Sequence, residues 1–249
     1  MHLRDLIVLV TGGGSGIGLE LSKQLVALGN TVFICGRRKE TLDAAADVFG
    51  LIPIVGDVSN QEDQERILAS VTERHGRLDL LINNAGVFGN YDFGDEANTA
   101  EGIEAEISIN AVAPLTLAKR ALPLLQLSEA PAILFIGSGV AYVPVASTPA
   151  YSGTKALIHH AAKALRHQLE PRGVSVFEAL PPVVDTDMGR ALKSKNLKVM
   201  QPEDLVAQIL GEMQDGTKEI AIGQSKQLRL MSRLAPEFIF RQMAKTEFH

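Results

Sequence analysis

A glycine-rich turn between a short apolar run and a helical pattern constrains the fold of this chain more than any other feature. Residues 11–18 read TGGGSGIG; the run Leu6–Val10 precedes them and the helical pattern Ile17–Leu28 follows. In a strand, turn and helix in this order, backbone N–H groups and the positive end of the helix dipole point at one place. A flexible turn is the simpler reading of the glycines alone, but this context predicts a dinucleotide pyrophosphate site. The expected contacts are Gly12, Ser15, Gly16, Ile17 and Gly18.

Short apolar runs rich in Val and Ile alternate with longer helical patterns along the chain. Continuously apolar runs are typical of parallel strands that are covered on both faces. The expected strands are Leu6–Val10, Thr31–Cys35, Ile52–Val55, Leu78–Ile82, Ala132–Ile136, Val174–Ala179 and Glu219–Ile222. The expected helices are Ile17–Leu28, Lys39–Val48, Gln61–Arg74, Ile103–Leu125, Thr154–Leu169 and Pro202–Met213. This alternation predicts an α/β fold, a single Rossmann-type domain over residues 1–249 whose doubly wound parallel sheet of about seven strands carries helices on both faces.

Two irregular stretches and an apolar tail stand outside this alternation. Phe88–Ala100 and Asp185–Val199 follow expected strand ends, the side of an open α/β sheet where ligands bind. Residues 185–199 are therefore predicted to form a substrate loop. The tail, about residues 228–249, is rich in Leu, Met, Ile and Phe. Apolar surface at a terminus normally packs onto the body of the protein or onto a partner subunit.

The composition excludes several classes of protein. The 249 residues carry 24 Lys and Arg against 29 Asp and Glu, a net charge of −5 with His neutral. Such a chain lacks the basic field that duplex nucleic acid or an anionic membrane requires, so we expect neither partner. Cys35 is the only cysteine, which excludes an internal disulfide and fits a reducing compartment. The N-terminal apolar run is too short for a membrane span and shows no signal-peptide cleavage site, so we expect a cytoplasmic protein.

Two arginines follow the second expected strand. NAD-binding enzymes commonly place an acid at this point to hold the ribose 2′-hydroxyl, whereas an arginine accommodates the 2′-phosphate of NADP. Here Gly36 is followed by Arg37 and Arg38, with no carboxylate at the strand tip. Both arginines are read most simply as solvated residues at a helix start, but a guanidinium is suited to bidentate phosphate binding. We therefore predict a preference for NADP(H), with NAD(H) possible.

Small and polar residues follow the third and fourth expected strands. Asp57 is placed to accept a hydrogen bond from an adenine amino group, with Val58 beside it. The turn that contains Asn84, Ala85 and Gly86 is small enough to let a cofactor pass while asparagine side chains brace neighbouring strands. Taken alone, the tetrapeptide NNAG (residues 83–86) fits any turn, because Asn and Gly favour turns generally.

Three further residues suit the chemistry of carbonyl reduction. Tyr151 and Lys155 are four apart at the start of a helical pattern, hence on one face, and Ser138 follows the fifth expected strand. Reduction of a carbonyl by hydride needs a proton donor to the nascent alkoxide. A free tyrosine titrates near pH ~10, and a nearby ammonium group and a positive nicotinamide ring are expected to lower that pKa. Ser138 is expected to hold the substrate oxygen beside the Tyr151 hydroxyl. Each residue alone is more often a simple neighbour; the conjunction with a nucleotide site predicts catalysis.

From residue 11 to about residue 222 the chain resembles the short-chain dehydrogenase/reductase family. The motifs that carry the resemblance are TGGGSGIG, NNAG, the asparagine of SINAVAP (Asn110), Ser138, and YSGTK with its tyrosine and lysine. The tail, RLMSRLAPEFIFRQMAKTEF, is similar to that of bacterial short-chain oxidoreductases associated with D-alanylation operons.

The resemblance implies roles for further residues. Asn110 is expected to interrupt its helix and hold a water that links Lys155 to solvent, and Lys155 to bind the nicotinamide ribose. The segment after the sixth strand implies cofactor contacts at Pro181, Val184 and Thr186. The family's subunit interface implies a homo-oligomer, either a dimer or a tetramer. Two departures from the family pattern are Pro182 in place of glycine and Ser15 in place of a basic residue that many NADP-preferring members carry.

The substrate is predicted only by class. Expected substrate contacts, besides Ser138 and Tyr151, are Val140, Tyr142 and Met188. They indicate an apolar or aromatic ketone or diketone, although pocket polarity is a weak guide. A 3-oxoacyl thioester reductase is the main alternative; a lyase or epimerase, or a non-catalytic nucleotide sensor, is less favoured. No ligand spacing typical of a metal site is present, so no metal is expected.

Overall fold

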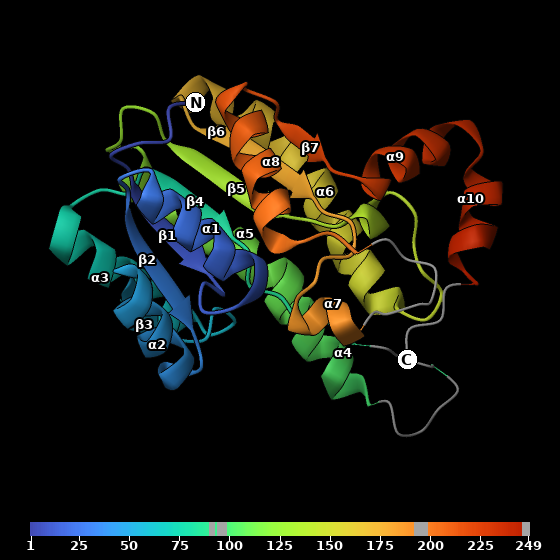
Figure 1. Ribbon diagram of the computed structural model, residues 1–249, viewed down its shortest axis with the longest axis horizontal. Coiled ribbons are helices and arrows are strands. Elements are labelled where there is room, and N and C mark those ends of the chain that lie inside the picture. Colours follow the sequence, from blue (N-terminus) through green and yellow to red (C-terminus); the bar gives the residue numbers. More distant parts are fainter. Residues whose placement is uncertain (90–92, 94–98, 192–198, 246–249) are drawn as a thin grey trace.

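A seven-stranded parallel sheet forms the centre of the protein, as the computed structural model shows (Figure 1). The structure describes residues 1–89, 93, 99–191 and 199–245. The strands are β1 (Ile7–Thr11), β2 (Thr31–Gly36), β3 (Ile52–Val55), β4 (Leu80–Asn83), β5 (Ala132–Ile136), β6 (Ser175–Leu180) and β7 (Glu219–Ala221). Their order is β3-β2-β1-β4-β5-β6-β7, so the order in which strands are added reverses between β1 and β4, although all strands are parallel. This confirms the predicted doubly wound fold, in which ligands bind at the carboxyl ends of the strands beside that reversal.

Helices cover both faces of the sheet because the strands are apolar on both sides. In β1, Val8 and Val10 pack into one core with α1 (Gly16–Ala27), α2 (Lys39–Phe49) and α8 (Pro202–Gln214). Ile7 and Leu9 point the other way, into a second core with α3 (Gln61–His75), α5 (Ala113–Leu125) and α6 (Pro149–Leu169). Figure 1 shows α1 and α8 side by side on the first face. Within the described part of the chain, no helix is long and apolar enough to cross a membrane.

The predicted helix Ile103–Leu125 is wrong as a single element. The structure shows α4 (Ala100–Ile107), a π-helical turn η1 (Ser108–Val112), and then α5. Asn110 lies in the π-helical turn, and π-turns inside helices often mark functional sites. The apolar periodicity continues through the break, so the sequence pattern alone shows one helix. The family resemblance did imply an interruption at Asn110.

The helix expected at Thr154–Leu169 begins earlier, at Pro149. Proline suits a first helical turn because it has no N–H to satisfy there. Tyr151 and Lys155 therefore both lie inside α6, one turn apart. Short 3₁₀ turns flank the region: η2 (Gly139–Ala141) follows β5, and η3 (Glu170–Arg172) ends α6.

The C-terminal tail forms two helices that the sequence patterns did not delimit. They are α9 (Gln224–Leu234) and α10 (Pro236–Met243), at the end of the molecule beyond β7 (Figure 1). A further short helix, α7 (Asp187–Ala191), opens the predicted substrate loop. Residues 192–198 of that loop, most of Phe88–Ala100, and the last four residues of the tail lie outside the described residues.

Candidate active site

A cavity of about 600 Å³ opens at the carboxyl ends of the central strands. Residues that follow β1, β2, β3, β4, β5 and β6 line it. The cavity therefore lies over the point between β1 and β4 where the strand order reverses. Most of the residues predicted from the sequence line this one cavity: Gly12, Ser15, Gly16, Ile17, Arg37, Arg38, Asp57, Val58, Asn84, Ala85, Gly86, Ser138, Val140, Tyr151, Lys155, Pro181, Val184, Thr186 and Met188. Gly18, Asn110 and Tyr142 lie elsewhere, as described below.

The glycine turn leaves its part of the cavity free of side chains. Gly12 and Gly16 have φ angles of +64° and +54°, a region that glycine enters without strain. A Cβ on Gly16 would lie 3.2 Å from Thr186 Cγ2 and would narrow the space between the turn and the segment after β6. Because α1 begins at Gly16, its N-terminal N–H groups face this space. A bare backbone at a helix start therefore fits the diphosphate of a dinucleotide.

Gly18 serves packing instead of lining the cavity. A Cβ there would lie 2.3 Å from the Gly12 carbonyl oxygen and 2.4 Å from Asn84 Nδ2. The third glycine of such a motif typically permits close helix–strand packing. Gly18 therefore affects the cofactor site only indirectly, by setting the position of α1.

Asn84 braces the turn as the sequence indicates. Its Nδ2 donates to the carbonyl oxygens of Thr11 at 2.9 Å and Gly12 at 3.2 Å. The Thr11 hydroxyl in turn accepts the N–H groups of Asn84 at 3.0 Å and Ala85 at 2.9 Å. These bonds join the glycine turn after β1 to the small-residue turn after β4.

The far end of the cavity carries two cations and one carboxylate. Arg37 Nη1 lies 3.8 Å from Asp57 Oδ2, and 63% of the Arg37 side chain is exposed. Arg38 is the N-cap residue of α2. An exposed ion pair between a guanidinium group and a carboxylate contributes little to stability. The Arg37 side chain is therefore able to turn toward a phosphate group. Asp57 also accepts the Ser59 N–H at 2.9 Å, which fixes its carboxylate at the rim.

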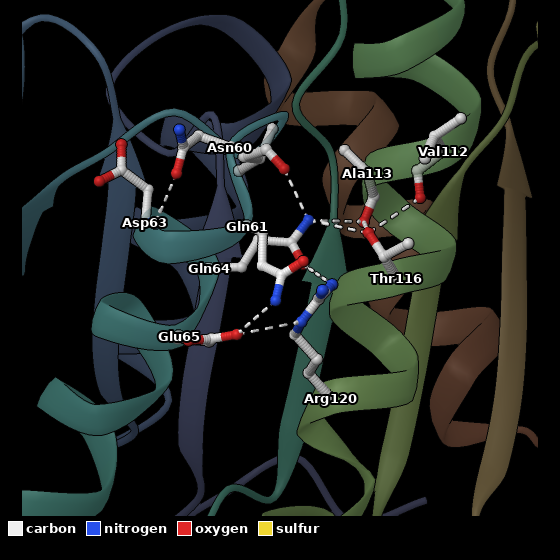
Figure 2. A network of polar contacts seen from close by, with 10 residues as sticks. Asn60, Gln61, Asp63, Gln64, Glu65, Val112, Ala113, Thr116 and Arg120 are labelled. Atoms are coloured by element: carbon white, nitrogen blue, oxygen red, sulfur yellow. Dashed lines mark hydrogen bonds and ion pairs between the residues drawn. The ribbon is translucent and has the colours of Figure 1, made fainter.

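A buried glutamine fixes the adjoining wall relative to α5 (Figure 2). Gln64 Nε2 donates to the Val58 carbonyl at 2.6 Å and to Thr116 Oγ1 at 2.9 Å. Its Oε1 accepts from Arg120 Nη1 at 2.7 Å. Val58 lines the cavity, while α5 follows directly on the π-helical turn that carries Asn110. Gln64 therefore ties two parts of the site that are far apart in the sequence.

Ser138 and Tyr151 meet at the inner part of the cavity. Tyr151 is 9% exposed, and its ring contacts Phe88 edge-on with centroids 5.2 Å apart. Burial raises the pKa of Tyr151 to about 12, and a hydrogen bond with Ser138 acts in the opposite direction. This differs from the lowered pKa expected from the sequence, because the cost of burying a phenolate outweighs that bond.

Lys155 is buried beside them. Its Nζ donates to the Ile136 carbonyl at 2.9 Å and lies 5.5 Å from the Tyr151 ring centroid. Burial lowers the pKa of Lys155 to about 8, while the negative charges of Glu178 and Glu106 raise it. The ammonium group is thus poised to change its charge close to neutral pH.

Asn110 is held by the backbone after β4. Its side-chain amide accepts the Val87 N–H at 2.8 Å and donates to the Val87 carbonyl at 2.8 Å. A Cβ on Gly86 would lie 3.2 Å from Asn110 Oδ1 and 3.9 Å from Lys155 Nζ. Asn110 therefore approaches Lys155 across Gly86, although it lies behind the cavity wall.

The segment after β6 closes the cavity on one side. Val184 pairs with Met200 in an isolated bridge, and the Asp185 N–H donates to the Met200 carbonyl at 2.9 Å. These bonds pin the base of the predicted substrate loop. The Thr186 hydroxyl accepts the Gly189 N–H at 3.0 Å, just before α7 begins at Asp187.

The tail contributes a wall that the sequence patterns did not assign to the site. The side chains that α9 and α10 supply to the cavity are Gln224, Ser225, Gln227, Leu228, Met231, Ile239 and Met243. Their spacing of three to four residues is the helical signal that was available in the sequence. Tyr142, an expected substrate contact, does not reach the cavity: its hydroxyl donates to Glu219 Oε1 at 2.7 Å, and its ring contacts His159 with centroids 5.1 Å apart.

Other candidate groups give no site. Within the described residues, no group of three or more His, Cys, Asp or Glu side chains is arranged to hold a metal ion. Cys35 is buried, and burial raises its thiol pKa to about 12. The thiol is therefore protonated at neutral pH and acts as a small core residue, although it borders the cavity floor.

Known proteins resemble this chain over nearly its full length. A family model described as short chain dehydrogenase matches residues 6–197. The uncharacterized oxidoreductase DltE of Bacillus subtilis (strain 168) is 34% identical over 253 residues, covering 99% of this chain and 100% of the relative. An uncharacterized oxidoreductase of Staphylococcus aureus (strain USA300) is 30% identical and covers 84% of this chain and 90% of the relative. The match to DltE includes the tail and confirms the narrower resemblance.

Solved structures share the fold. A short chain dehydrogenase from Burkholderia cenocepacia J2315, in complex with NADP, superposes with a TM-score of 0.85 and 25% identity, covering 98% of this chain and 99% of that one. A 3-ketoacyl-(acyl-carrier-protein) reductase from Brucella melitensis, complexed with NADH, has a TM-score of 0.81 and 21% identity, covering 90% and 100%. The second likeness concerns the fold alone.

Proposed function

This chain belongs to the short-chain dehydrogenase family, and we propose that it is an NADP(H)-dependent oxidoreductase that interconverts a carbonyl and a secondary alcohol. The observation that carries the proposal is the position of Ser138, Tyr151 and Lys155 in the same cavity as the bare glycine turn. A proton donor and a dinucleotide cradle in one cavity are what carbonyl reduction requires.

Each catalytic residue has a defined role in the proposed reaction. A nicotinamide dinucleotide held by the glycine turn would supply the hydride for the carbonyl carbon. Ser138 orients the substrate oxygen, and Tyr151 protonates that oxygen from its buried hydroxyl. Lys155 holds a positive charge beside Tyr151 and binds the cofactor ribose. In the oxidative direction Tyr151 accepts the proton instead, and Asn110 connects Lys155 to solvent through a water molecule.

The preference for NADP(H) rests on the far end of the cavity. Arg37 and Arg38 line it where an NAD enzyme would carry an acid, and Arg37 is exposed enough to reach a 2′-phosphate. The relative from Burkholderia cenocepacia binds NADP, which supports the same assignment. NAD(H) remains the second cofactor in this proposal because Ser15 does not add the positive charge that many NADP-preferring relatives carry.

The substrate proposed is an apolar or aromatic ketone or diketone. Val140, Phe88 and Met188 line the cavity that Ser138 lines. The tail adds Leu228, Met231, Ile239 and Met243 to the same cavity. A 3-oxoacyl thioester reductase is the second candidate, because an apolar channel also accepts an acyl chain. The presence of Ser138, Tyr151 and Lys155 together argues against a nucleotide sensor that lacks catalysis.

The proposal includes a homo-oligomer, either a dimer or a tetramer. Large apolar side chains on the tail remain exposed, with Leu234 at 71% and Phe238 at 58%. Leu157 on α6 is 45% exposed. Such surfaces are typical of subunit contacts. Light scattering at micromolar concentration that shows only monomer would contradict this part.

A screen of cofactor oxidation tests the proposed activity. The full chain is incubated with NADPH, and in parallel with NADH, against ketones, diketones, aldehydes, 3-oxoacyl thioesters and sugars. The loss of absorbance at the nicotinamide band is followed. We expect turnover with an apolar ketone or diketone and greater efficiency with NADPH. Binding of NADPH without oxidation by any carbonyl compound would contradict the reductase assignment and favour a lyase, an epimerase or a sensor.

A further inference from the structure

Two carboxylates outside the recognised motifs are buried near Lys155. Glu106, on α4, is 1% exposed, and Glu178, on β6, is 0% exposed. Burying an ionised carboxylate costs several kcal/mol unless hydrogen bonds or an opposite charge offset it. The fold accepts this cost at two residues whose charges both act on one lysine, so each residue calls for a physical reason.

Glu106 acts from the side of Asn110. It lies one helical turn before Asn110, and its Oε1 is 3.4 Å from Asn110 Nδ2. The other end of the Asn110 amide, Oδ1, approaches Gly86, and Lys155 Nζ approaches the same glycine. Glu106 thus contacts the amide of Asn110, and Asn110 and Lys155 both approach Gly86.

Glu178 acts from the sheet. Its Oε2 accepts a bond from His159 Nδ1 at 2.8 Å and lies 3.9 Å from Arg166 Nη2. Its Oε1 has no hydrogen-bond partner within the described residues, and it lies 2.9 Å from the place that a Cβ on Gly137 would take. Gly137 follows Ile136, whose carbonyl accepts the bond from Lys155. Glu178 therefore borders the strand end to which Lys155 is anchored.

We propose that Glu106 and Glu178 are positioning residues that keep Lys155 in its ammonium form. The proposal rests on the proposed function in one respect, the role of a charged Lys155 beside Tyr151. Neither glutamate lines the cavity in the described structure, so both act through Lys155 and its neighbours and not on the substrate.

The electrostatics of the surrounding groups agree with this geometry. Burial lowers the pKa of Lys155, and the charges of Glu178 and Glu106 raise it again. Glu106 also raises the pKa of Tyr151. On the far side of Glu178, the hydrogen bond with that carboxylate raises the pKa of His159, and Arg166 supplies a permanent positive charge. Without the two carboxylates, burial would lower the pKa of Lys155 further.

A titration of Lys155 itself tests the proposal without turnover. The full chain is labelled with ¹³C-lysine, the Lys155 ¹³Cε signal is assigned by its loss in Lys155→Arg, and the signal is followed against pH by NMR. In Glu106→Gln and in Glu178→Gln, we expect the pKa of Lys155 to fall by roughly one unit each, the effect of a charge several ångströms away. Glu104→Gln, an exposed glutamate on the same helix, is the matched control and should leave it unchanged.

An unchanged Lys155 pKa in both variants would overturn the proposal, as would an equal fall in Glu104→Gln. If the strand position of Glu178 does not tolerate glutamine, Glu106→Gln alone decides the result. The pH profile of NADPH oxidation adds a second readout: its alkaline limb should move to lower pH in the variants, whereas a purely structural defect would lower the rate at every pH. A shifted Lys155 pKa without turnover in the wild type would refute the reductase function and leave the positioning role intact.

Discussion

The side chain of Asn110 and the backbone of Val87 exchange two hydrogen bonds, both 2.8 Å long. The amide thus bonds both backbone groups of Val87, as a neighbouring strand would. Asn110 is 2% exposed, and its bonds to the half-buried Val87 are partly shielded from water. The π-helical turn is what aims the amide at Val87.

We expect Asn110→Ala to destabilise the protein by about 1–3 kcal/mol, because it removes both amide partners of the half-buried N–H and carbonyl groups of Val87. The free energy of unfolding in urea measures this loss. Asn60→Ala is a suitable control, since Asn60 accepts one exposed bond from the Asp63 N–H at 3.0 Å at the start of α3. A smaller loss at Asn110 than at Asn60 would contradict the bonding described.

Tyr151→Phe should abolish turnover while NADPH binding stays nearly unchanged. The substitution removes the hydroxyl that donates the proton but keeps the ring that contacts Phe88. Steady-state rates and fluorescence titration with NADPH separate the two effects. Tyr142→Phe is the matched control, because the Tyr142 hydroxyl bonds to Glu219 away from the cavity, and it should retain turnover. Measurable reduction by Tyr151→Phe would rule out its role as the acid.

Arg37→Ala should raise the KM for NADPH roughly tenfold or more and leave the KM for NADH nearly unchanged, as expected for loss of one charged hydrogen bond to phosphate. Lys39→Ala removes a nearby exposed charge that pairs with Asp43 on α2 and serves as the control. The comparison of kcat/KM for the two cofactors gives the result. Equal losses with both cofactors would show that Arg37 does not read the 2′-phosphate.

Gly18→Ala should destabilise the protein by about 1–3 kcal/mol, because the added methyl group overpacks α1 against the Gly12 carbonyl, 2.3 Å away. In α6 a Cβ on Gly153 would meet nothing within 4 Å. Gly153→Ala should therefore stabilise the helix by about 0.5–1 kcal/mol. Thermal unfolding of the two variants compares the same chemical change in opposite surroundings. Similar shifts in Tm would refute the packing argument.

The bond between His159 and Glu178 makes stability depend on pH. The side-chain hydrogen bond with Glu178 raises the pKa of His159 above its ordinary value of 6.5, so the folded state binds this proton more tightly than the unfolded state. The resulting stabilisation is complete below pH 6.5 and is lost as the pH rises through the folded pKa.

Unfolding free energies at about pH 6 and about pH 8 check this dependence. The wild type should lose more stability over that interval than His159→Gln. His160→Gln, which changes an exposed neighbour on the same helix, should behave as the wild type does. An identical pH dependence in all three proteins would show that the bond to Glu178 has no such effect.

Local patterns in the sequence predicted the sheet and most of the site, because both depend on residues that are close in the chain. The continuous apolar runs mark strands covered on both faces. Each strand end supplies its own group to the cavity, such as Arg37 after β2 and Ser138 after β5. Parallel strands bring their carboxyl ends to one edge, so the site follows once the order of elements is known.

The tertiary structure alone decided how these groups act on one another. The helix pattern ran through Asn110 without a sign of the π-turn, and Tyr142 looked like a substrate contact until its hydroxyl was found on Glu219. Glu106 and Glu178 are ordinary charged residues in the sequence, and only burial beside Lys155 gives them importance. A pKa depends on solvent exclusion and on charges from distant segments. The sequence therefore determined which groups meet, and the packing determined which protons they hold.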